Sequence, residues 1–468
     1  MAEKGCVVMQ SLLDSMGWVP RTCVWEITRA CNLHCGHCGS MAGSARRDEL
    51  STVECRGVID ELAQLGNQLI TLSGGEPTLR RDWPELASYA TDRGIAVNLV
   101  TNGQVDGKLL AEQAQGARLA NVAVSLDGLE STHDALRTRG AFRRASSAIQ
   151  SLSMAGLWVD VMVTINRRNL PELDELHQYA AGLGAKRFRV QLGKPMGNQT
   201  HRADLTLAPK QLLELLPMLS HLDRKRHLPV LLGDSVGYFS AAERRLRGER
   251  CDQEHWTGCY AGCQAIGIQS DGSIKGCLSL QPRAGEQDPF IEGNVRKEPL
   301  RDIWLDPRRF SYNRAPQHEL SGACGQCSHR TLCRGGAKCV AYSFTGKLEQ
   351  DPMCYLAVSR SAPSIRIWPT AAAAMLLGAS IPGCSGVVSP TPGNTGGAGG
   401  SSAVTGGATA TTGGQTNGGA TSAGGTAATG GKSSSGTAGT SSIDCSTVCC
   451  MCDYGVIPPD KYAACCSH

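Results

Sequence analysis

The sequence predicts an α/β fold: an open, partial (β/α)6 barrel, followed by a cysteine-rich domain and a disordered tail. Three observations support this prediction. Apolar, β-branched runs alternate with amphipathic helical patterns between residues 21 and 222. Cysteine, glycine and turn residues replace that periodicity between residues 251 and 354. A tract rich in Gly, Thr, Ser and Ala follows, which lacks the apolar surface needed to fold.

Six strand candidates, each followed by a helix candidate, make up the alternating region. Consecutive βα units indicate a parallel sheet with right-handed crossovers, and six units rather than eight indicate a TIM-like barrel that stays open. The chemistry of such folds lies at the carboxyl ends of the strands. The predicted strands are Cys23–Thr28, Gln68–Ser73, Ala96–Thr101, Asn121–Leu126, Val159–Ile165 and Arg187–Leu192. The predicted helices are Val53–Leu65, Trp83–Arg93, Gly107–Gln115, Arg143–Ala155, Pro171–Leu183 and Pro209–Leu222.

The composition shifts divide the chain into seven segments. The apolar run after the cysteine-rich domain resembles a signal-peptide core and is too short to span a bilayer. The predicted segments are an N-terminal piece (1–20), the barrel (21–225), a connector (226–250), the cysteine-rich domain (251–358), the apolar run (359–384), a low-complexity linker (385–442) and a cysteine-rich tail (443–468).

Charge and cysteine content narrow the class of protein. The net charge of +4 over 468 residues is mild and no basic stripe is present, which argues against nucleic-acid binding. Residues 1–20 lack the pattern of a signal peptide, so we expect a cytoplasmic protein whose core does not enter a membrane. In such a chain, 22 cysteines indicate metal or redox chemistry rather than disulfides.

Three cysteines follow the first predicted strand in the pattern CxxxCxxC. Cys31, Cys35 and Cys38 place three thiolates on one loop, and thiolates are the usual ligands of iron–sulfur clusters. A cubane has four irons, so three ligands leave one iron open for a substrate or cofactor. His34 and His37 lie within the same loop, and zinc is therefore the alternative.

The segment from Trp25 to Cys38 resembles the signature of the radical S-adenosylmethionine (SAM) superfamily. The resemblance implies a 4Fe–4S cluster whose open iron is chelated by SAM. It implies that one electron cleaves SAM to a 5′-deoxyadenosyl radical, which abstracts hydrogen from substrate. His37 occupies the position that the family usually fills with an aromatic residue beside the adenine.

Further motifs follow later predicted strands. Gly74, Gly75 and Glu76 resemble the family's GGEP segment, which holds the SAM amino group; such a sequence is also an ordinary turn. Ser125 and Arg137 match SAM-binding positions of the sulfatase-maturing branch, and a guanidinium fork suits the SAM carboxylate. The alternative for Arg137 is a surface position on a helix.

Two amides end the fifth and sixth predicted strands. Asn166 and Gln191 are candidates for contact with the ribose or adenine of SAM, and a capping or turn role is the alternative for both.

The cysteine-rich domain resembles the SPASM extension of radical SAM peptide and cofactor maturases. The resemblance implies two auxiliary 4Fe–4S clusters; a zinc-ribbon-like domain is the alternative. It places Cys259, Cys263, Cys277 and Cys339 on the first cluster, and Cys324, Cys327, Cys333 and Cys354 on the second. Ala337 stands where the family spacing expects a cysteine, so Cys339 reaches in from two residues further on or one cluster has an open iron. Leu278 replaces the acidic residue of sulfatase-maturing members, which argues against that activity.

These features predict a radical SAM enzyme that modifies a peptide, such as a ribosomally made one. The tail, with Cys445, Cys449, Cys450, Cys452, Cys465 and Cys466, is a candidate substrate in cis; a disulfide or metal-binding module and an inert appendage are its alternatives. Maturation of a tetrapyrrole or quinone cofactor is the second hypothesis, and a non-catalytic electron carrier the third. The expected partners are the peptide and a one-electron reductant such as flavodoxin or ferredoxin.

Overall fold

The computed structural model describes residues 18–225, 228–233, 236–248, 256–283, 285–315 and 319–361. The predicted linker (385–442) and cysteine-rich tail (443–468) lie outside the described residues, as does the predicted apolar run beyond residue 361. Every helix within the described ranges is too short or too polar to cross a lipid bilayer.

The six predicted strands are confirmed, each to within one residue at either end. They are β1 (Thr22–Thr28), β2 (Leu69–Gly74), β3 (Ala96–Thr101), β4 (Asn121–Ser125), β5 (Val159–Ile165) and β6 (Arg187–Leu192). Four short strands were not predicted: β7 (Val230–Leu232), β8 (Ala265–Ile268), β9 (Ser273–Lys275) and β10 (Gly293–Asn294). All belong to one sheet, in the order β10-β9-β8-β1-β2-β3-β4-β5-β6-β7.

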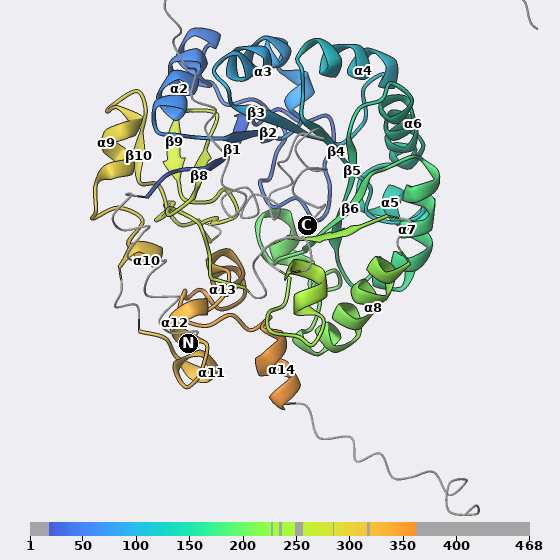
Figure 1. Cartoon of the computed structure of the whole chain (residues 1–468), viewed down its shortest axis with the longest axis vertical. Coiled ribbons are helices and arrows are strands. Elements are labelled where there is room, and N and C mark those ends of the chain that lie inside the picture. The colour runs from blue at the N-terminus through green and yellow to red at the C-terminus, as the bar shows by residue number, and fades with distance from the viewer. Residues whose placement is uncertain are drawn as a thin grey trace, which may run out of the picture. The chain divides into compact units, whose positions relative to one another are not determined.

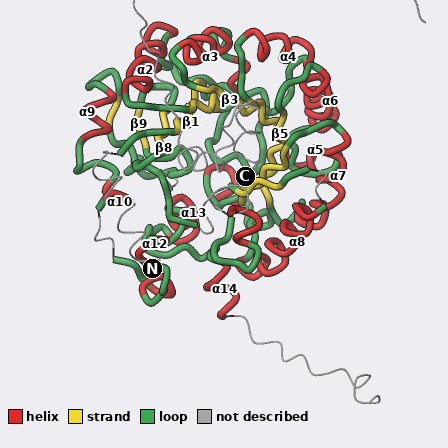
Figure 2. The backbone as a smooth tube through the Cα atoms, in the orientation of Figure 1, coloured by secondary structure: helices red, strands yellow, loops and turns green. Residues whose placement is uncertain are grey.

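The sheet is parallel from β8 through β1 to β7, and antiparallel at β9 and β10. Its strands curve into an arc with the helices on the outer side (Figures 1 and 2). Val122, Ala123 and Val124 are buried at consecutive positions of β4, and so are Val159, Asp160 and Val161 of β5. Side chains buried on successive positions are typical of a parallel sheet covered on both faces. The partial barrel is therefore confirmed.

The predicted barrel helices are also present, and one short helix, α5, was not predicted. The helices of the barrel are α2 (Thr52–Gln64), α3 (Trp83–Asp92), α4 (Gly107–Gly116), α5 (Glu130–Leu136), α6 (Ala141–Met154), α7 (Leu173–Gly182) and α8 (Leu212–Arg224). The cysteine-rich region adds α9 (Leu300–Leu305), α10 (Ser311–Arg314), α11 (Gly322–Gly325), α12 (Arg330–Cys333), α13 (Lys338–Thr345) and α14 (Tyr355–Ser361).

The cysteine-rich region is joined to the barrel through the sheet itself. Strand β8 pairs in parallel with β1, with Thr22 opposite Ala265 and Trp25 opposite Ile268. Next to this pairing, the buried Glu26 accepts hydrogen bonds from Arg46 (2.8 Å) and from the Ser270 hydroxyl (3.1 Å). The β1–β8 pairing and these contacts of the Glu26 side chain thus hold the loops that follow β1 and β8 against one another.

Candidate active site

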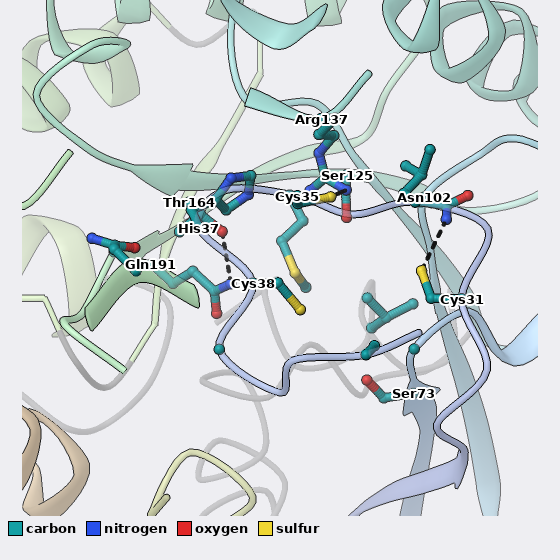
Figure 3. Close-up of a pocket in the computed structure, with 18 of the residues that line it drawn as sticks. Cys31, Cys35, His37, Cys38, Ser73, Asn102, Ser125, Arg137, Thr164 and Gln191 are labelled. Atoms are coloured by element: carbon teal, nitrogen blue, oxygen red, sulfur yellow. Dashed lines mark hydrogen bonds between the residues drawn. The ribbon is translucent and has the colours of Figure 1, made fainter. Parts of the chain in front are cut away.

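A cavity of about 230 Å³ lies at the carboxyl ends of the barrel strands, where the fold predicts the chemistry. It brings together nine of the eleven residues that the sequence singled out for the first cysteine motif and for SAM binding. Those that line it are Cys31, Cys35, His37, Cys38, Gly74, Gly75, Ser125, Arg137 and Gln191. Figure 3 shows the cysteines around a common space, with Arg137 and Ser125 above it, Ser73 below it and Gln191 to one side.

Backbone contacts hold the cysteine loop in place. At its base, Cys31 N donates to Gly43 O (2.8 Å). At its far end, the backbone N–H of Asn198 donates to Cys38 O (2.9 Å), and its side-chain amide donates to Cys35 O (3.0 Å). Because both ends are tied to other segments, the three thiols keep a fixed orientation toward the cavity.

A buried carboxylate organises the wall opposite these thiols. Asp127 is fully buried and accepts from Arg137 Nε (2.7 Å) and Thr164 N (2.8 Å), and His37 Nε2 lies 3.0 Å from it. Burial alone would raise the pKa of Asp127, but Arg137 and His37 outweigh it and hold that pKa well below its ordinary value. Asp127 therefore stays ionised and fixes two cavity side chains.

The guanidinium of Arg137 also reaches the cysteine loop. Its Nη1 lies 3.9 Å from Cys35 Sγ. Burial raises the pKa of Cys35 to about 11, although Arg137 opposes this rise. Burial and the same guanidinium lower the pKa of the neighbouring His133 to about 4, so this imidazole is neutral at pH 7. Its Nδ1 accepts from the backbone N–H of Asp127 (3.0 Å).

Gly74 and Gly75 are required by close backbone approach. A Cβ on Gly74 would collide with Thr28 O, and a Cβ on Gly75 would collide with Ala30 O. Gly74 also has a φ of 142°, which L-residues with side chains rarely adopt. The two glycines therefore let the end of β2 pack against the start of the cysteine loop.

Two predicted residues lie outside the cavity lining. Glu76 is fully buried and accepts from the Thr101 hydroxyl and from Asn102 N, both at 2.7 Å. Asn166 is fully buried, and its side-chain oxygen accepts from Arg168 N (2.9 Å). The contacts of Asn166 are those of the turn role that the sequence left open.

A second cavity, of about 140 Å³, is lined by the later cysteines. Cys324, Cys327, Cys333 and Cys354 all line it, the same four that the family resemblance grouped together. Burial, with the nearby Cys354, raises the pKa of Cys333 to about 12. Thiols of this kind are protonated at neutral pH unless a metal binds them.

The other four cysteines of the region also interact with one another. Cys277 and Cys339 are hydrogen-bonded, which lowers the pKa of Cys277 and raises that of Cys339. Cys259 lies close enough to Cys263 for its charge to raise the pKa of that thiol. Cys339 raises the pKa of Cys259 in the same way. Two groups of four thiols therefore lie beside the barrel.

Comparison with known proteins identifies the family. The Radical SAM superfamily model matches residues 25–180, and the SPASM iron–sulfur cluster-binding domain matches residues 259–328. Mycofactocin maturase MftC of Mycobacterium tuberculosis is 35% identical over 342 residues, covering 72% of this chain and 83% of MftC. The chain belongs to the radical SAM superfamily. It is accordingly an enzyme, with SPASM as its second domain.

A second curated relative of this radical SAM enzyme is named for a different activity. The AdoMet-dependent heme synthase of Methanosarcina barkeri is 32% identical over 347 residues, covering 72% of this chain and 96% of that protein. The solved structure of Streptococcus suis SuiB bound to S-adenosylmethionine has a TM-score of 0.57 at 18% identity, covering 72% of this chain and 77% of SuiB. That likeness shows the shared fold.

Membership of the radical SAM family, with a SPASM domain, implies 4Fe–4S clusters and SAM, and the main cavity fits them. Three thiols from one loop form part of its wall. His37 Nδ1 is buried without a hydrogen-bond partner among the described residues, which suits a wall completed by a ligand. Within the same described residues, no three Cys, His, Asp or Glu side chains converge as one metal ion requires.

Sequence reasoning missed several polar residues of the cavity wall. Ser73 and Thr164 lie at or next to the ends of β2 and β5 and could have been found from the rule that strand ends carry the site. Asn102, in the turn that follows β3, lines the same cavity. Asn102 Nδ2 lies 3.9 Å from Cys31 Sγ. Lys194, two residues after β6, and Ser279, from the SPASM domain, also line the cavity.

Proposed function

We propose that this enzyme modifies a peptide by SAM-dependent hydrogen abstraction in the 230 Å³ cavity. The observation that carries the proposal is the meeting, in one cavity, of three thiols from one loop, a fixed guanidinium and a SPASM residue. The named activity of MftC as a maturase supports a peptide-type substrate, as does the solved structure of SuiB with its precursor peptide SuiA.

We assign Cys31, Cys35 and Cys38 as ligands of the SAM-binding cluster. When bound, this cluster and SAM supply the one-electron chemistry that generates the hydrogen-abstracting species. The two further clusters take the two groups of thiols in the SPASM domain. The first group is Cys259, Cys263, Cys277 and Cys339, and the second is Cys324, Cys327, Cys333 and Cys354.

The remaining wall residues bind and orient SAM in this proposal. Arg137, held by Asp127 through its Nε, offers its guanidinium to the SAM carboxylate. The close approach at Gly74 and Gly75 exposes backbone groups to the SAM amino group. His37, fixed by the same carboxylate, lies beside the adenine.

Ser125 and Gln191 supply polar contacts to the ribose or adenine. Glu76 acts from behind the wall, because it holds the turn that carries Asn102. Asn166 remains a candidate residue for SAM binding. It would act indirectly, because its side chain stabilises the turn after β5.

The peptide substrate is proposed to include the chain's own cysteine-rich tail. Residues 385–442 are rich in Gly, Thr, Ser and Ala, and a linker of this composition gives a tethered segment a high effective concentration at the active site.

We place the enzyme in the cytoplasm, where flavodoxin or ferredoxin would supply electrons.

A tetrapyrrole is the second candidate substrate, because the heme synthase relative is 32% identical across 96% of its own length. Two experiments separate the candidates. The enzyme lacking residues 385–468 would be given a synthetic peptide of residues 443–468, and mass spectrometry would follow the peptide. The same enzyme would be given an iron porphyrin precursor. A mass change in the peptide alone supports peptide modification; turnover of the porphyrin with an unchanged peptide overturns it.

The cluster assignment has its own test. Anaerobic reconstitution of the full chain should give about twelve irons, four for each cluster, and SAM should yield 5′-deoxyadenosine under reduction. Replacing Cys31, Cys35 and Cys38 together by alanine should remove about four irons and all 5′-deoxyadenosine. Retention of SAM cleavage by this triple variant would overturn the assignment.

A further inference from the structure

Lys194 lies where the main cavity meets the first group of SPASM cysteines. Its side chain lines the cavity, and its Nζ lies 3.6 Å from Cys339 Sγ. Its charge also acts on Cys277 and on the buried Asp351. One ammonium from the barrel is thus shared between the SAM-side cavity and a thiol of the auxiliary domain.

The backbone around Lys194 is fixed. Gly193 N donates to Ile165 O (2.8 Å), and Met196 N donates to Lys194 O (2.7 Å). A Cβ on Gly193 would lie 3.0 Å from the side chain of Gln199, so the chain passes close to its neighbours here. The lysine therefore leaves the end of β6 at a defined place rather than from a free loop.

Another lysine lies closer to Cys339 in sequence but serves a different purpose. Lys338 is buried, and its Nζ donates to Arg334 O (2.7 Å) and Leu348 O (3.0 Å). Those carbonyls take two of the three N–H groups of its ammonium within the SPASM domain. Among the described residues, Lys194 is the lysine whose ammonium contacts a sulfur of the first group of SPASM cysteines.

We propose that Lys194 is a positioning residue that donates a charge-assisted hydrogen bond to Cys339 and raises the reduction potential of the first auxiliary cluster. The proposal rests on the assignment of Cys339 as a ligand of that cluster. Reduction adds negative charge to a cluster, so a nearby cation stabilises the reduced form. Hydrogen bonds to ligand sulfurs are a recognised means of adjusting such potentials.

The consequence is a link between the two halves of the enzyme. Lys194 belongs to the barrel, whereas Cys339 lies on α13 of the SPASM domain. Ser279 reaches the same cavity from the other side, and its backbone N–H lies 3.4 Å from Cys277 Sγ. The cavity wall therefore includes groups that contact two sulfurs of the first auxiliary group.

The test is a redox titration followed by electron paramagnetic resonance. It uses the full chain, reconstituted without oxygen, with Cys31, Cys35 and Cys38 replaced by alanine so that the auxiliary signals stand alone. Lys194→Met should shift one of the two auxiliary potentials to a more negative value and leave the other unchanged. Lys194→Arg should restore most of the shift. Lys186→Met, an exposed lysine at the opposite end of β6, is the matched control and should change neither potential.

The proposal is overturned if Lys194→Met leaves both potentials at their original values, or if Lys186→Met shifts one as strongly. If Lys194→Met binds less iron than the parent, Lys194→Gln is titrated in its place. This variant keeps a neutral hydrogen-bond donor and should give a smaller shift in the same direction. The absence of a shift in Lys194→Gln counts against the proposal. Failure of the cluster assignment is recognised separately, because the parent chain would then bind fewer than about eight auxiliary irons.

Discussion

Replacing Asp127 by asparagine would test how the SAM-side wall is organised. The substitution keeps the shape of the side chain but removes the charge that Arg137 and His37 share. We expect two effects, a loss of stability and a loss of affinity for SAM. The two effects have different causes and can be measured separately.

The magnitude of the stability effect follows from burial. Asp127 is 0% exposed and the side chain of Arg137 is 9% exposed, so the variant leaves a buried guanidinium without its counter-charge. Breaking a buried ion pair in this way costs about 3–5 kcal/mol of unfolding free energy. For SAM, the loss of one oriented charge-assisted contact corresponds to about 1.5–3 kcal/mol. That is roughly a 10- to 100-fold rise in Kd.

Asp160 provides a matched control, because it forms a comparably buried pair with Arg187 near the opposite end of the strands. The side chains of this pair are 0% and 11% exposed, with Nε 2.9 Å from the carboxylate. Asp160→Asn should lose similar stability in anaerobic urea unfolding, yet bind SAM as the parent does in calorimetry. Our reasoning fails if Asp127→Asn binds SAM with unchanged Kd, or if Asp160→Asn weakens SAM binding equally.

Three further predictions follow from particular contacts. Gly74→Ala should abolish SAM-dependent 5′-deoxyadenosine formation, because its Cβ would strike Thr28 O. Gly94 also has a positive φ but has open space around it, so Gly94→Ala should cost only about 1–2 kcal/mol of stability and keep activity. Cys333→Ala and Cys354→Ala should each lose about four irons in an iron analysis. Because both thiols serve one cluster, the double variant should lose no more iron than either single variant. Glu54→Gln should cost about 0.5 kcal/mol of unfolding free energy, since its pair with Arg296 is partly exposed. Arg296 and Ser51 lower the folded pKa of Glu54 below its unfolded value near 4.3. The difference from the parent should therefore be constant between about pH 6 and 8 and disappear only as pH falls below about 4.5; a difference that varies between pH 6 and 8 would contradict this.

The barrel was predictable from sequence because most of its strands are largely apolar and each is followed by a helical pattern, even though β6 alternates polar and apolar residues. Strands β1 and β5 contain seven residues each and are bounded by turn residues. Strands β8 and β9 contain four and three residues and lie among cysteines and glycines, where no period can be read. Their place in the sheet depends on pairing with β1, more than 200 residues away, which local pattern does not reveal.

The site was predictable to the extent that its residues belong to short motifs. Cys31, Cys35 and Cys38 lie on one loop, so their spacing alone brings them together. Lys194 contributes through a contact with Cys339, 145 positions later in the chain, and no motif marks it. Asp127 was not predicted as a site residue, because a buried carboxylate is recognised by its partners rather than by its neighbours in sequence.

The continuity of the sheet has a mechanistic consequence for electron transfer. The cysteine loop follows β1, and Cys277 follows β9, which is joined to β1 through β8. Backbone pairing of this kind leaves little freedom for the loop and the first auxiliary group to move apart, because such motion would break several hydrogen bonds at once. A rigid separation suits one-electron transfer between centres, while the adjustable parts are side chains at the boundary. Lys194 is such a side chain, so a ligand that enters the cavity and draws its ammonium away from Cys339 would change the auxiliary potential without any change in the fold.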